Sequence, residues 1–538
     1  MNIGTEILII GGGATGLSVA RDAVLRGFKT VVVEKGDLAH GTSGRYHGLL
    51  HSGGRYVVSD PESARECFTE NQILRSLIPT ALEDTGGFFV STPDDPPEYA
   101  DEFLAACQVC GIPVEEIPVG TALREEPLLH PGIRRAFRVP DMACDSFDTL
   151  HLLAADARRH GVEVYLRRRV EKLIQSEERI TGAVLRNLVT GEEERIQADL
   201  LLNCTGPWVG EIAALAGYEV NVIPSKGTMI AMNMRLTNTV VNRCKPPHDG
   251  DILVPVGTVS ILGTTEVTAK SADKYQITDS EISLLLAEGE KLIPTLGSYR
   301  PLRAWAGVRP LFDANADGRD DADSRQVSRG HHVLNHRERD GVRGLLSIVG
   351  GKFTTMRLMA EELVDVACAE LGVTETCTTA STPIEPAASN FYTLPQRLQA
   401  LEERTARPLR KQPSNANLIC ECELVTAADV EASLRNSDSH ILNDLRRDTR
   451  LGMGPCQAGF CAYRAAGIAS RELEIDATQT IAALAQFLQE RWKGQRPLLW
   501  GHNLRQAELD LHIYRDLFGL DRMPATRKIK AYPTEETA

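Results

Sequence analysis

The 538-residue sequence predicts an α/β protein: a parallel sheet built from discontinuous segments, an inserted and mostly antiparallel sheet, and a small helical Cys-rich domain at the C-terminal end. Three observations predict this arrangement. Apolar runs alternate with helical patterns at the N-terminus and return after residue 160, which is typical of a parallel sheet covered on both faces. Short β-rich runs gather between residues 217 and 346. Two tight pairs of cysteines follow a Pro-rich stretch.

Composition and charge exclude several classes of protein. Hydrophobic residues make up 42% and charged residues 25% of the chain, so a disordered chain is excluded. The net charge of −14 argues against nucleic acid as the main partner. Residues 381–538 carry equal numbers of acidic and basic side chains, so the acidic excess lies in residues 1–380. No apolar run is long enough to span a bilayer, and we expect a reducing cytoplasm because no signal-peptide pattern accompanies the 12 cysteines.

The first elements form a βαβ unit. Residues 6–10 predict a buried strand, residues 15–26 a helix and residues 29–33 a second buried strand. The turn between the first strand and the helix, Gly11-Gly12-Gly13-Ala14-Thr15-Gly16, fits the pattern G-x-G-x-x-G. Glu34 ends the second strand, at the place where an acidic side chain binds a ribose hydroxyl. The unit therefore predicts a Rossmann-like dinucleotide-binding domain.

The rest of the chain favours FAD over NAD. A long Gly-rich loop follows the first unit at residues 36–59, where a nicotinamide enzyme usually continues with βα units. Two further strand-end turns lie far downstream, at Thr205-Gly206 and at Gly350-Gly351. Three such turns converging on one ligand suit a long, enclosed flavin dinucleotide.

The domain boundaries follow from these patterns and from a Pro-rich linker. The FAD-binding domain is expected in three parts, and the inserted substrate domain in two. The expected ranges are 1–75, 146–217 and 344–378 for the FAD-binding domain, 76–145 and 218–343 for the substrate domain, 379–413 for the linker, 414–470 for the Cys-rich domain and 471–538 for a helical tail.

Several motifs together resemble one enzyme family. They are Gly11–Gly16 with Glu34, Gly48–Tyr56, Trp305–Pro310, Gly350–Arg357 and the C-terminal cysteines. The sequence resembles the FAD-dependent glycerol-3-phosphate dehydrogenases, specifically the flavin subunit of the three-subunit anaerobic enzyme. The resemblance implies oxidation of sn-glycerol 3-phosphate to dihydroxyacetone phosphate. It also implies two partner subunits that hold the chain at the inner face of the cell membrane, with a quinone as the eventual acceptor.

A phosphorylated alcohol needs cations for its phosphate and a polar group near its hydroxyl. The resemblance places Arg55 with Tyr56 and Arg309 at the substrate, and Lys352 near flavin and substrate. Arg329 is a further candidate cation, and His51 is the candidate for polarising the substrate or relaying its proton. A metal site at His47 and His51 is disfavoured because the surrounding glycines argue against a helix. Met229 stands where single-subunit aerobic relatives tend to have a His, which leaves the proton acceptor open.

The expected cofactor-binding residues gather in the glycine-rich turns and the loop after the first unit. They are Gly11, Gly13, Ala14, Thr15, Gly16, Glu34, Lys35, Thr42, Ser43, Gly48, Leu49, Val170, Thr205, Gly206, Gly350, Gly351, Lys352, Phe353 and Thr354.

The C-terminal cysteines predict a metal centre. Cys420 and Cys422 form a C-x-C pair, and Cys456 and Cys461 form a C-x₄-C pair. Four thiolates in this pattern can hold zinc or an iron-sulfur cluster, and buried cysteines without a metal are the third interpretation. The arrangement resembles the bacterioferritin-associated-ferredoxin-like domain, which implies a 2Fe-2S cluster. The pair at residues 107 and 110 comes late in a helical pattern, so we interpret it as packing.

Two other functions fit part of the sequence. A related flavin oxidoreductase could act on an amino acid or a 2-hydroxy acid. A noncatalytic electron-transfer subunit could keep FAD and the cluster without turning over a substrate.

Overall fold

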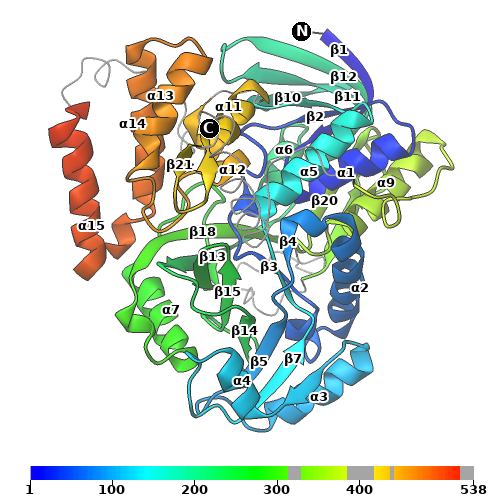
Figure 1. The fold of residues 1–538 in the computed structure, drawn as a ribbon. Helices are drawn as coiled ribbons and strands as arrows, with labels where there is room; N and C mark the ends of the chain where they lie inside the picture. Colours follow the sequence, from blue (N-terminus) through cyan, green and yellow to red (C-terminus); the bar gives the residue numbers. More distant parts are fainter. Residues whose placement is uncertain (1, 313–328, 385–416, 437–440, 521–538) are drawn as a thin grey trace, which may run out of the picture.

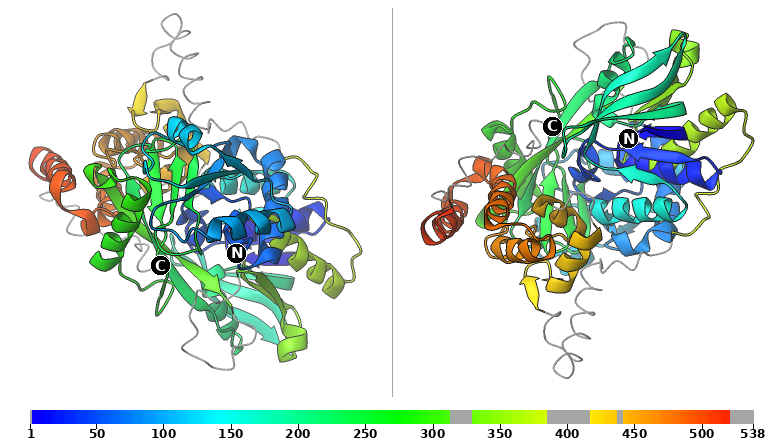
Figure 2. Two further views of the ribbon diagram at one scale, coloured as in Figure 1. Left: turned by 90° about the horizontal axis from the view of Figure 1, so that it is seen from below. Right: turned by 90° about the horizontal axis from the view of Figure 1, so that it is seen from above.

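The computed structural model describes residues 2–312, 329–384, 417–436 and 441–520. Within these ranges the chain forms two large sheets and a helical C-terminal module (Figure 1). In both views of Figure 2 the orange and red helices of the module lie on one side of the molecule, and the blue N-terminal elements lie on the other. Most of the expected linker at 379–413, and the end of the chain after residue 520, lie outside the described residues.

The first sheet contains the predicted βαβ unit. Its parallel strands run in the order β9-β2-β1-β12-β20. The antiparallel β10–β11 hairpin pairs with the first half of β12, and β19 pairs antiparallel with β20. The strands are β1 (Asn2–Ile10), β2 (Thr30–Val33), β9 (Glu163–Tyr165), β10 (Arg168–Ser176), β11 (Arg179–Asn187), β12 (Glu193–Asn203), β19 (His331–Asn335) and β20 (Leu345–Gly350).

Both faces of this sheet are buried, as its continuous apolar strands predict. Ile7 and Ile9 of β1 pack in one hydrophobic cluster with the helices α1, α5 and α9. Leu8 and Ile10 point to the opposite face and pack with residues of β10 and β11, because successive side chains of a strand alternate. The helices are α1 (Ala14–Leu25), α5 (Ser146–Arg159) and α9 (Met356–Leu371), and the short α6 (Val209–Ala214) and α8 (His336–Asp340) lie near β20.

The second sheet is assembled from two separate stretches of chain. Its strands run in the order β17-β13-β16-β15-β14-β5-β7-β6, and β18 pairs with the other edge of β13. All of these pairs are antiparallel except β5 with β14. The strands are β5 (Gly87–Ser91), β6 (Glu115–Ile117), β7 (Arg135–Val139), β13 (Ile223–Met232), β14 (Val240–Arg243), β15 (Ile252–Val256), β16 (Val259–Gly263), β17 (Val267–Thr268) and β18 (Pro301–Leu311).

These observations confirm the predicted α/β class with an inserted, mostly antiparallel sheet. β19 lies within the range expected for the inserted domain, yet it pairs at the edge of the first sheet. Helices and short strands surround the second sheet. They are α2 (Pro61–Leu77), α3 (Tyr99–Cys110), α4 (Val119–Glu125) and α7 (Asp279–Leu292), with β3 (Leu49–Leu50), β4 (Leu82–Glu83) and β8 (Met142–Cys144) in a small third sheet.

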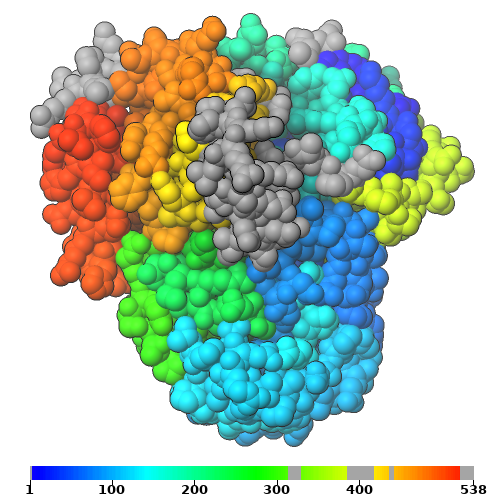
Figure 3. Space-filling view, viewed as in Figure 1, coloured from blue at the N-terminus to red at the C-terminus, as the bar shows by residue number. Residues whose placement is uncertain are grey.

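The C-terminal module has its own hydrophobic core. The core draws on residues from both sides of the expected boundary at residue 470. In the space-filling view the orange surface of the module continues into the green surface of the second sheet (Figure 3). The elements are β21 (Leu418–Cys420), β22 (Val425–Thr426), α11 (Ala427–Asn436), α12 (Leu442–Thr449), α13 (Cys461–Glu472), α14 (Ala477–Lys493) and α15 (Gly501–His512). Across the described ranges, no helix combines the length and apolar character needed to cross a membrane.

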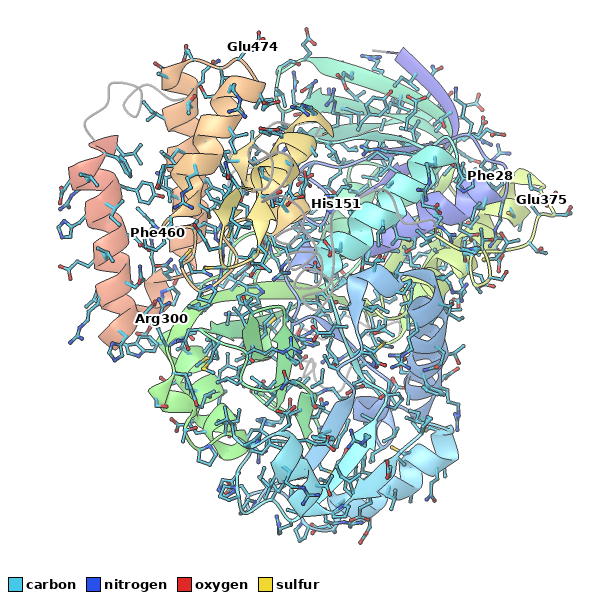
Figure 4. The ribbon with its side chains drawn as sticks, in the orientation of Figure 1. Phe28, His151, Arg300, Glu375, Phe460 and Glu474 are labelled. Carbon is cyan, nitrogen blue, oxygen red and sulfur yellow. The ribbon has the colours of Figure 1, made fainter. Side chains whose placement is uncertain are left out.

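Ion pairs hold the module against the first sheet and its helices. Asp444 of α12 accepts from Arg167 at 2.6 Å, and Arg450 pairs with Asp145 at the start of α5. His151 of α5, labelled in Figure 4, contacts Asp448 of α12, and its Nε2 lies 2.8 Å from a carboxylate oxygen. Burial by itself would lower the pKa of His151, but the Asp448 carboxylate reverses this effect and raises the pKa to about 9.

The His151 contact predicts a pH dependence of stability. A histidine whose folded pKa lies above its unfolded value stabilises the fold fully below the unfolded pKa, here 6.5, and this contribution is lost as the pH rises toward 9. The unfolding temperature of the wild type should therefore fall more steeply between pH 6.5 and 9 than that of His151→Gln. Differential scanning calorimetry measures this difference. Parallel pH profiles for the two proteins would contradict the assignment, and Asp448→Asn should match His151→Gln.

Candidate active site

A cavity of about 910 Å³ lies where strand ends of the first sheet face the second sheet. Its walls include all three glycine-containing turns that the sequence predicted to converge, at residues 11–15, 204–208 and 350–354. The carboxyl ends of parallel strands meet at one edge of a sheet, which is why segments so distant in sequence line one cavity. Its volume lies within the range of sites that enclose a cofactor or substrate.

The first turn opens a helix N-terminus onto the cavity. Gly11 has a φ of +115°, and a Cβ there would lie 2.7 Å from the carbonyl oxygen of Cys204. A Cβ on Gly16 would lie 1.9 Å from the carbonyl oxygen of Gly11, so only glycine lets α1 pack this closely on the end of β1. The backbone N–H of Ala14 donates to Ser43 Oγ at 3.0 Å. The turn thus presents its amides and the positive end of α1 to an anionic group.

Glu34 is fixed at the edge of the same cavity. Its two carboxylate oxygens accept from the backbone N–H groups of Gly12 and Gly36, each at 2.7 Å. Next to it, the Lys35 ammonium lies 3.9 Å from the ring centroid of Trp208.

The cavity brings together most of the predicted site residues. Gly16 and Gly48 do not line it: Gly16 serves helix packing, and Gly48 faces a neighbouring cavity. The predicted residues that line it are Gly11, Gly13, Ala14, Thr15, Glu34, Lys35, Thr42, Ser43, Leu49, His51, Arg55, Tyr56, Val170, Thr205, Gly206, Arg309, Arg329, Gly350, Gly351, Lys352, Phe353 and Thr354.

Two observations show that the walls suit a bound dinucleotide. The hydroxyl of Thr354 is buried without a hydrogen-bond partner, which is costly unless a ligand supplies one. A Cβ placed on Gly206 would meet no atom within 4 Å, so the second turn is open toward the cavity.

Arg309 supplies a cation that is paired with no described carboxylate. Its guanidinium donates to Thr264 Oγ1 at 2.5 Å and to Ser225 Oγ at 3.3 Å, and it forms no ion pair within the described residues. A Cβ on Gly227 would lie 2.6 Å from Arg309 Nη2, so this glycine makes room for the side chain. Burial, followed by the charge of Arg329, lowers the pKa of Arg309 to about 10, which keeps it cationic at neutral pH.

The other predicted cations differ in how they are compensated. Arg329 donates to both carboxylate oxygens of Glu266 at 2.8 Å, while its Nη1 is buried without a partner. Arg55 forms an ion pair with Asp251 at 3.1 Å. Lys352 Nζ donates to hydroxyl and carbonyl oxygens, and it lies 5.5 Å from the ring centroid of Tyr56. This end of the cavity therefore keeps an excess of positive charge and an unused donor.

His51 is 8% exposed and neutral. Burial, and next the charge of Lys352, lower its pKa well below the ordinary value. Its Nδ1 accepts from the backbone N–H of Gly53 at 3.3 Å, which leaves the imidazole proton on Nε2. His47, which also lines the cavity, has the same arrangement with Leu49 N–H at 3.1 Å. This geometry makes both rings Nε2–H donors, and for His51 it favours polarising a substrate oxygen over accepting its proton.

Sequence reasoning missed several lining residues. Glu266 and Thr264 lie in no recognisable motif, and only the folded sheet brings them to the arginines. Tyr46 stacks on Phe353 with ring centroids 4.6 Å apart, and the sequence marked its neighbour His47 only as half of a disfavoured metal pair. Met229, at the position considered for the proton acceptor, is buried and does not line the cavity.

The four C-terminal cysteines come together. The thiol of Cys420 contacts that of Cys461, and the thiol of Cys456 contacts those of Cys422 and Cys461. Contacts from the thiols of Cys422 and Cys461 lower the pKa of Cys456 strongly. Nevertheless, no group of three or more His, Cys, Asp or Glu side chains in the described part of the chain is arranged to hold a metal ion. The cysteines at 107 and 110 lie in the last turns of α3, where they are buried in the core that this helix shares with β5 and β7.

Comparisons with known proteins agree with a dinucleotide-binding cavity. The model of the FAD dependent oxidoreductase family matches residues 6–365. The solved glycerol-3-phosphate dehydrogenase of Bacillus halodurans, complexed with FAD, aligns over 97% of this chain and 92% of its own with a TM-score of 0.58 and 20% identity. The L-alpha-glycerophosphate oxidase of Mycoplasma pneumoniae covers 71% of this chain and 100% of its own, with a TM-score of 0.57 and 17% identity. The chain is an FAD-dependent oxidoreductase.

Curated relatives identify one family within this class of oxidoreductases. The A subunit of the anaerobic glycerol-3-phosphate dehydrogenase of Escherichia coli (strain K12) is 41% identical over 96% of this chain and 97% of its own length. The A1 subunit of the corresponding enzyme of Haloferax volcanii is 39% identical over 97% of this chain and 92% of its own. The chain belongs to the family of anaerobic glycerol-3-phosphate dehydrogenase A subunits.

Proposed function

We propose that this chain oxidises sn-glycerol 3-phosphate to dihydroxyacetone phosphate. The observation that carries the proposal is the excess of positive charge at one end of the cavity, where the uncompensated Arg309 lies near Arg329 and its unused Nη1 donor. A dianionic phosphate supplies the charge and the acceptor oxygens that these guanidiniums lack.

Each residue of this end has a role in the proposal. Arg309 and Arg329 bind the phosphate, and Lys352 adds positive charge beside it. The Nε2–H of His51 donates to the oxygen on C2, which orients the C–H bond and stabilises that oxygen as its hydroxyl proton leaves to solvent. Arg55 is held by Asp251 and, with Tyr56, shapes the wall of the cavity. When bound, FAD supplies the acceptor for the hydride that leaves C2.

An amino acid or 2-hydroxy acid is the alternative substrate class. The structure of glycine oxidase from Geobacillus kaustophilus resembles this fold, with a TM-score of 0.54 and 20% identity. A carboxylate carries a single negative charge, however, whereas Arg309 and Lys352 supply two positive charges that no described carboxylate pairs with. The number of cations therefore favours a phosphate. A noncatalytic electron-transfer subunit would not need cations at this end of the cavity.

Replacing Arg309 tests the proposal. In Arg309→Ala, kcat/KM for glycerol 3-phosphate should fall about 100-fold, because charge-assisted hydrogen bonds to the phosphate are lost. FAD content should stay at the wild-type level, and Arg124→Ala on the surface of α4 should behave like wild type. Anaerobic bleaching of the flavin by substrate measures the reaction. A wild-type flavin that glycerol 3-phosphate leaves oxidised, or full activity in Arg309→Ala, would refute the proposal.

We propose further that Cys420, Cys422, Cys456 and Cys461 hold a 2Fe-2S cluster. The observation that supports it is the donor set, four thiols brought together at one place in the C-terminal module. Thiolates are the ligands of such clusters, and zinc is the alternative for the same set. A cluster held by these four thiolates would carry electrons away from the flavin one at a time.

Replacing Cys456 separates the cluster from the flavin chemistry. Anaerobically purified Cys456→Ser should lose iron and the reddish absorbance of the cluster, while substrate still bleaches its flavin. Cys377→Ser, which changes a cysteine outside the set, is the matched control and should keep both. Iron analysis and visible spectra measure the two centres. Zinc without iron in the wild-type protein would refute the cluster.

The proposed acceptors are partner subunits. We infer that a second and a third subunit bind this chain, hold it at the inner face of the cell membrane and pass electrons to a quinone. The supporting observation is the exposure of aromatic side chains beside Cys461. Phe460, labelled in Figure 4, is 44% exposed, and Tyr463 and Phe518, whose rings contact each other, are 38% and 40% exposed. If the chain co-purifies with no other subunit from its native membranes, this part of the proposal fails.

A further inference from the structure

The turn around Cys456 is shaped to hold negatively charged sulfur atoms. The backbone N–H groups of Ala458 and Phe460 donate to the sulfur of Cys456. A Cβ on Gly454 would clash with the Cβ of Cys422, so glycine lets the two cysteine pairs approach each other. Amide donors stabilise thiolates and tune the clusters that thiolates hold. The turn therefore fits a thiolate-bound centre.

A buried arginine faces this turn from α14. Arg491 is 2% exposed, and its Nη2 donates at 2.8 Å to Oε1 of Gln457, the residue next to Cys456. Gln457 in turn donates to the carbonyl oxygens of Met453 and Gly454 at 3.1 Å and 3.0 Å, so the guanidinium is tied to the turn through one side chain. The Nε of Arg491 has no hydrogen-bond partner, and Arg491 forms no ion pair with a carboxylate of the described residues.

The thiols are the negative groups that Arg491 faces. Burial, and next the charges of Arg303 and Arg446, lower the pKa of Arg491, whereas negative charge on Cys461 and Cys456 raises it. A guanidinium stays protonated in proteins, and a buried cation needs a negative group close by. In the described part of the chain, the thiolates supply this negative charge for Arg491.

Two further charged side chains reach the same turn. Arg300, labelled in Figure 4, immediately precedes β18 and donates to the carbonyl oxygen of Pro455 at 2.8 Å. Asp510 of α15 is buried, and a Cβ on Gly459 would lie 2.7 Å from its Oδ1, so glycine makes room for the carboxylate. Burial raises the pKa of Asp510 to about 6, which leaves it ionised at pH 8. Arg300 and Asp510 act on each other as well as on Cys456, so their charges partly cancel.

We propose that Arg491 is the counter-charge of the metal–thiolate centre and raises the reduction potential of the 2Fe-2S cluster at Cys420, Cys422, Cys456 and Cys461. The inference rests on that proposed cluster. A cluster with four thiolate ligands is anionic, and one electron from the reduced flavin adds one negative charge to it while no bond forms or breaks. In a buried site a nearby cation interacts more strongly with the more negative state. Arg491 therefore favours electron transfer from the flavin to the cluster.

Redox titration of the anaerobically purified, full-length protein tests this role, with the electron paramagnetic resonance signal of the reduced cluster as the readout. At a fixed potential, Arg491→Gln should lower the ratio of reduced to oxidised cluster at least tenfold, which is 59 mV for one electron. Arg491→Lys keeps the positive charge and should restore most of this ratio. Arg505→Gln, an exposed change on α15, should match the wild type.

Asp510→Asn separates the effect of charge from an effect of packing. At pH 8 this change removes a negative charge near Cys456, so it should raise the ratio of reduced to oxidised cluster, opposite to Arg491→Gln. A turn that is merely loosened would admit water and would shift both variants in the same direction.

Iron content of the same samples separates the possible failures. Absence of iron from the wild type would overturn the proposed cluster, and this inference with it. Iron at the wild-type level in Arg491→Gln with an unchanged potential would overturn the counter-charge alone, as would a shift of Arg491→Gln and Asp510→Asn in one direction. Loss of iron from Arg491→Gln but not from Arg491→Lys would support the counter-charge, whereas loss from both would overturn it. None of these outcomes bears on the oxidation of glycerol 3-phosphate, which flavin bleaching tests separately.

Discussion

The contact between Gly16 and the carbonyl oxygen of Gly11 is the constraint on which the site depends. With no room for a Cβ between them, α1 is pressed onto the end of β1, and its first amides face the cavity. The same helix packs against α5 and α9, so its position is also linked to that of the turn at Gly350, which precedes α9 and lines the same cavity. A small change at this contact would thus displace the helix that carries the binding turn, together with the layer that supports it.

The cations of the larger cavity divide into two kinds. Arg55 and Arg329 each have a carboxylate partner, whereas Arg309 and Lys352 contact only hydroxyl and carbonyl oxygens among the described residues. Arg329 Nη2 donates to both carboxylate oxygens of Glu266 at 2.8 Å, which holds this side chain in place without a ligand and leaves Nη1 available to donate. The charges of Arg309 and Lys352 are the ones that a substrate must neutralise. This division explains how an acidic protein can present a positive site to an anion.

Local patterns predicted the fold class and much of the larger cavity. The glycine turn with Glu34 is a contiguous motif whose geometry is local, and the alternation of apolar runs identified the sheet it belongs to. The pairing of Arg329 with Glu266 and the Nε2–H state of His51 were beyond sequence reasoning, because each depends on contacts between distant strands or on a backbone amide. The sequence analysis also did not predict the edge strand β19, since His331 and His332 give it little apolar character. The cysteine spacing predicted that the four thiols meet, but it does not choose between metals.

Strand β18 contributes side chains to two cavities, the larger one and the neighbouring one that Gly48 faces. Its even-numbered side chains, Ala304, Ala306 and Val308, are buried in the protein, while Arg303, Trp305 and Arg309 share the opposite face. Because side chains alternate along a strand, inserting or deleting one residue before Arg303 would turn all three away from their cavities at once. At its start, Arg300 donates to the carbonyl oxygen of Pro455, next to Cys456. A functional variant must therefore keep both the length of this strand and the alternation of its side chains. Natural variants of the strand should differ by substitutions and not by insertions or deletions.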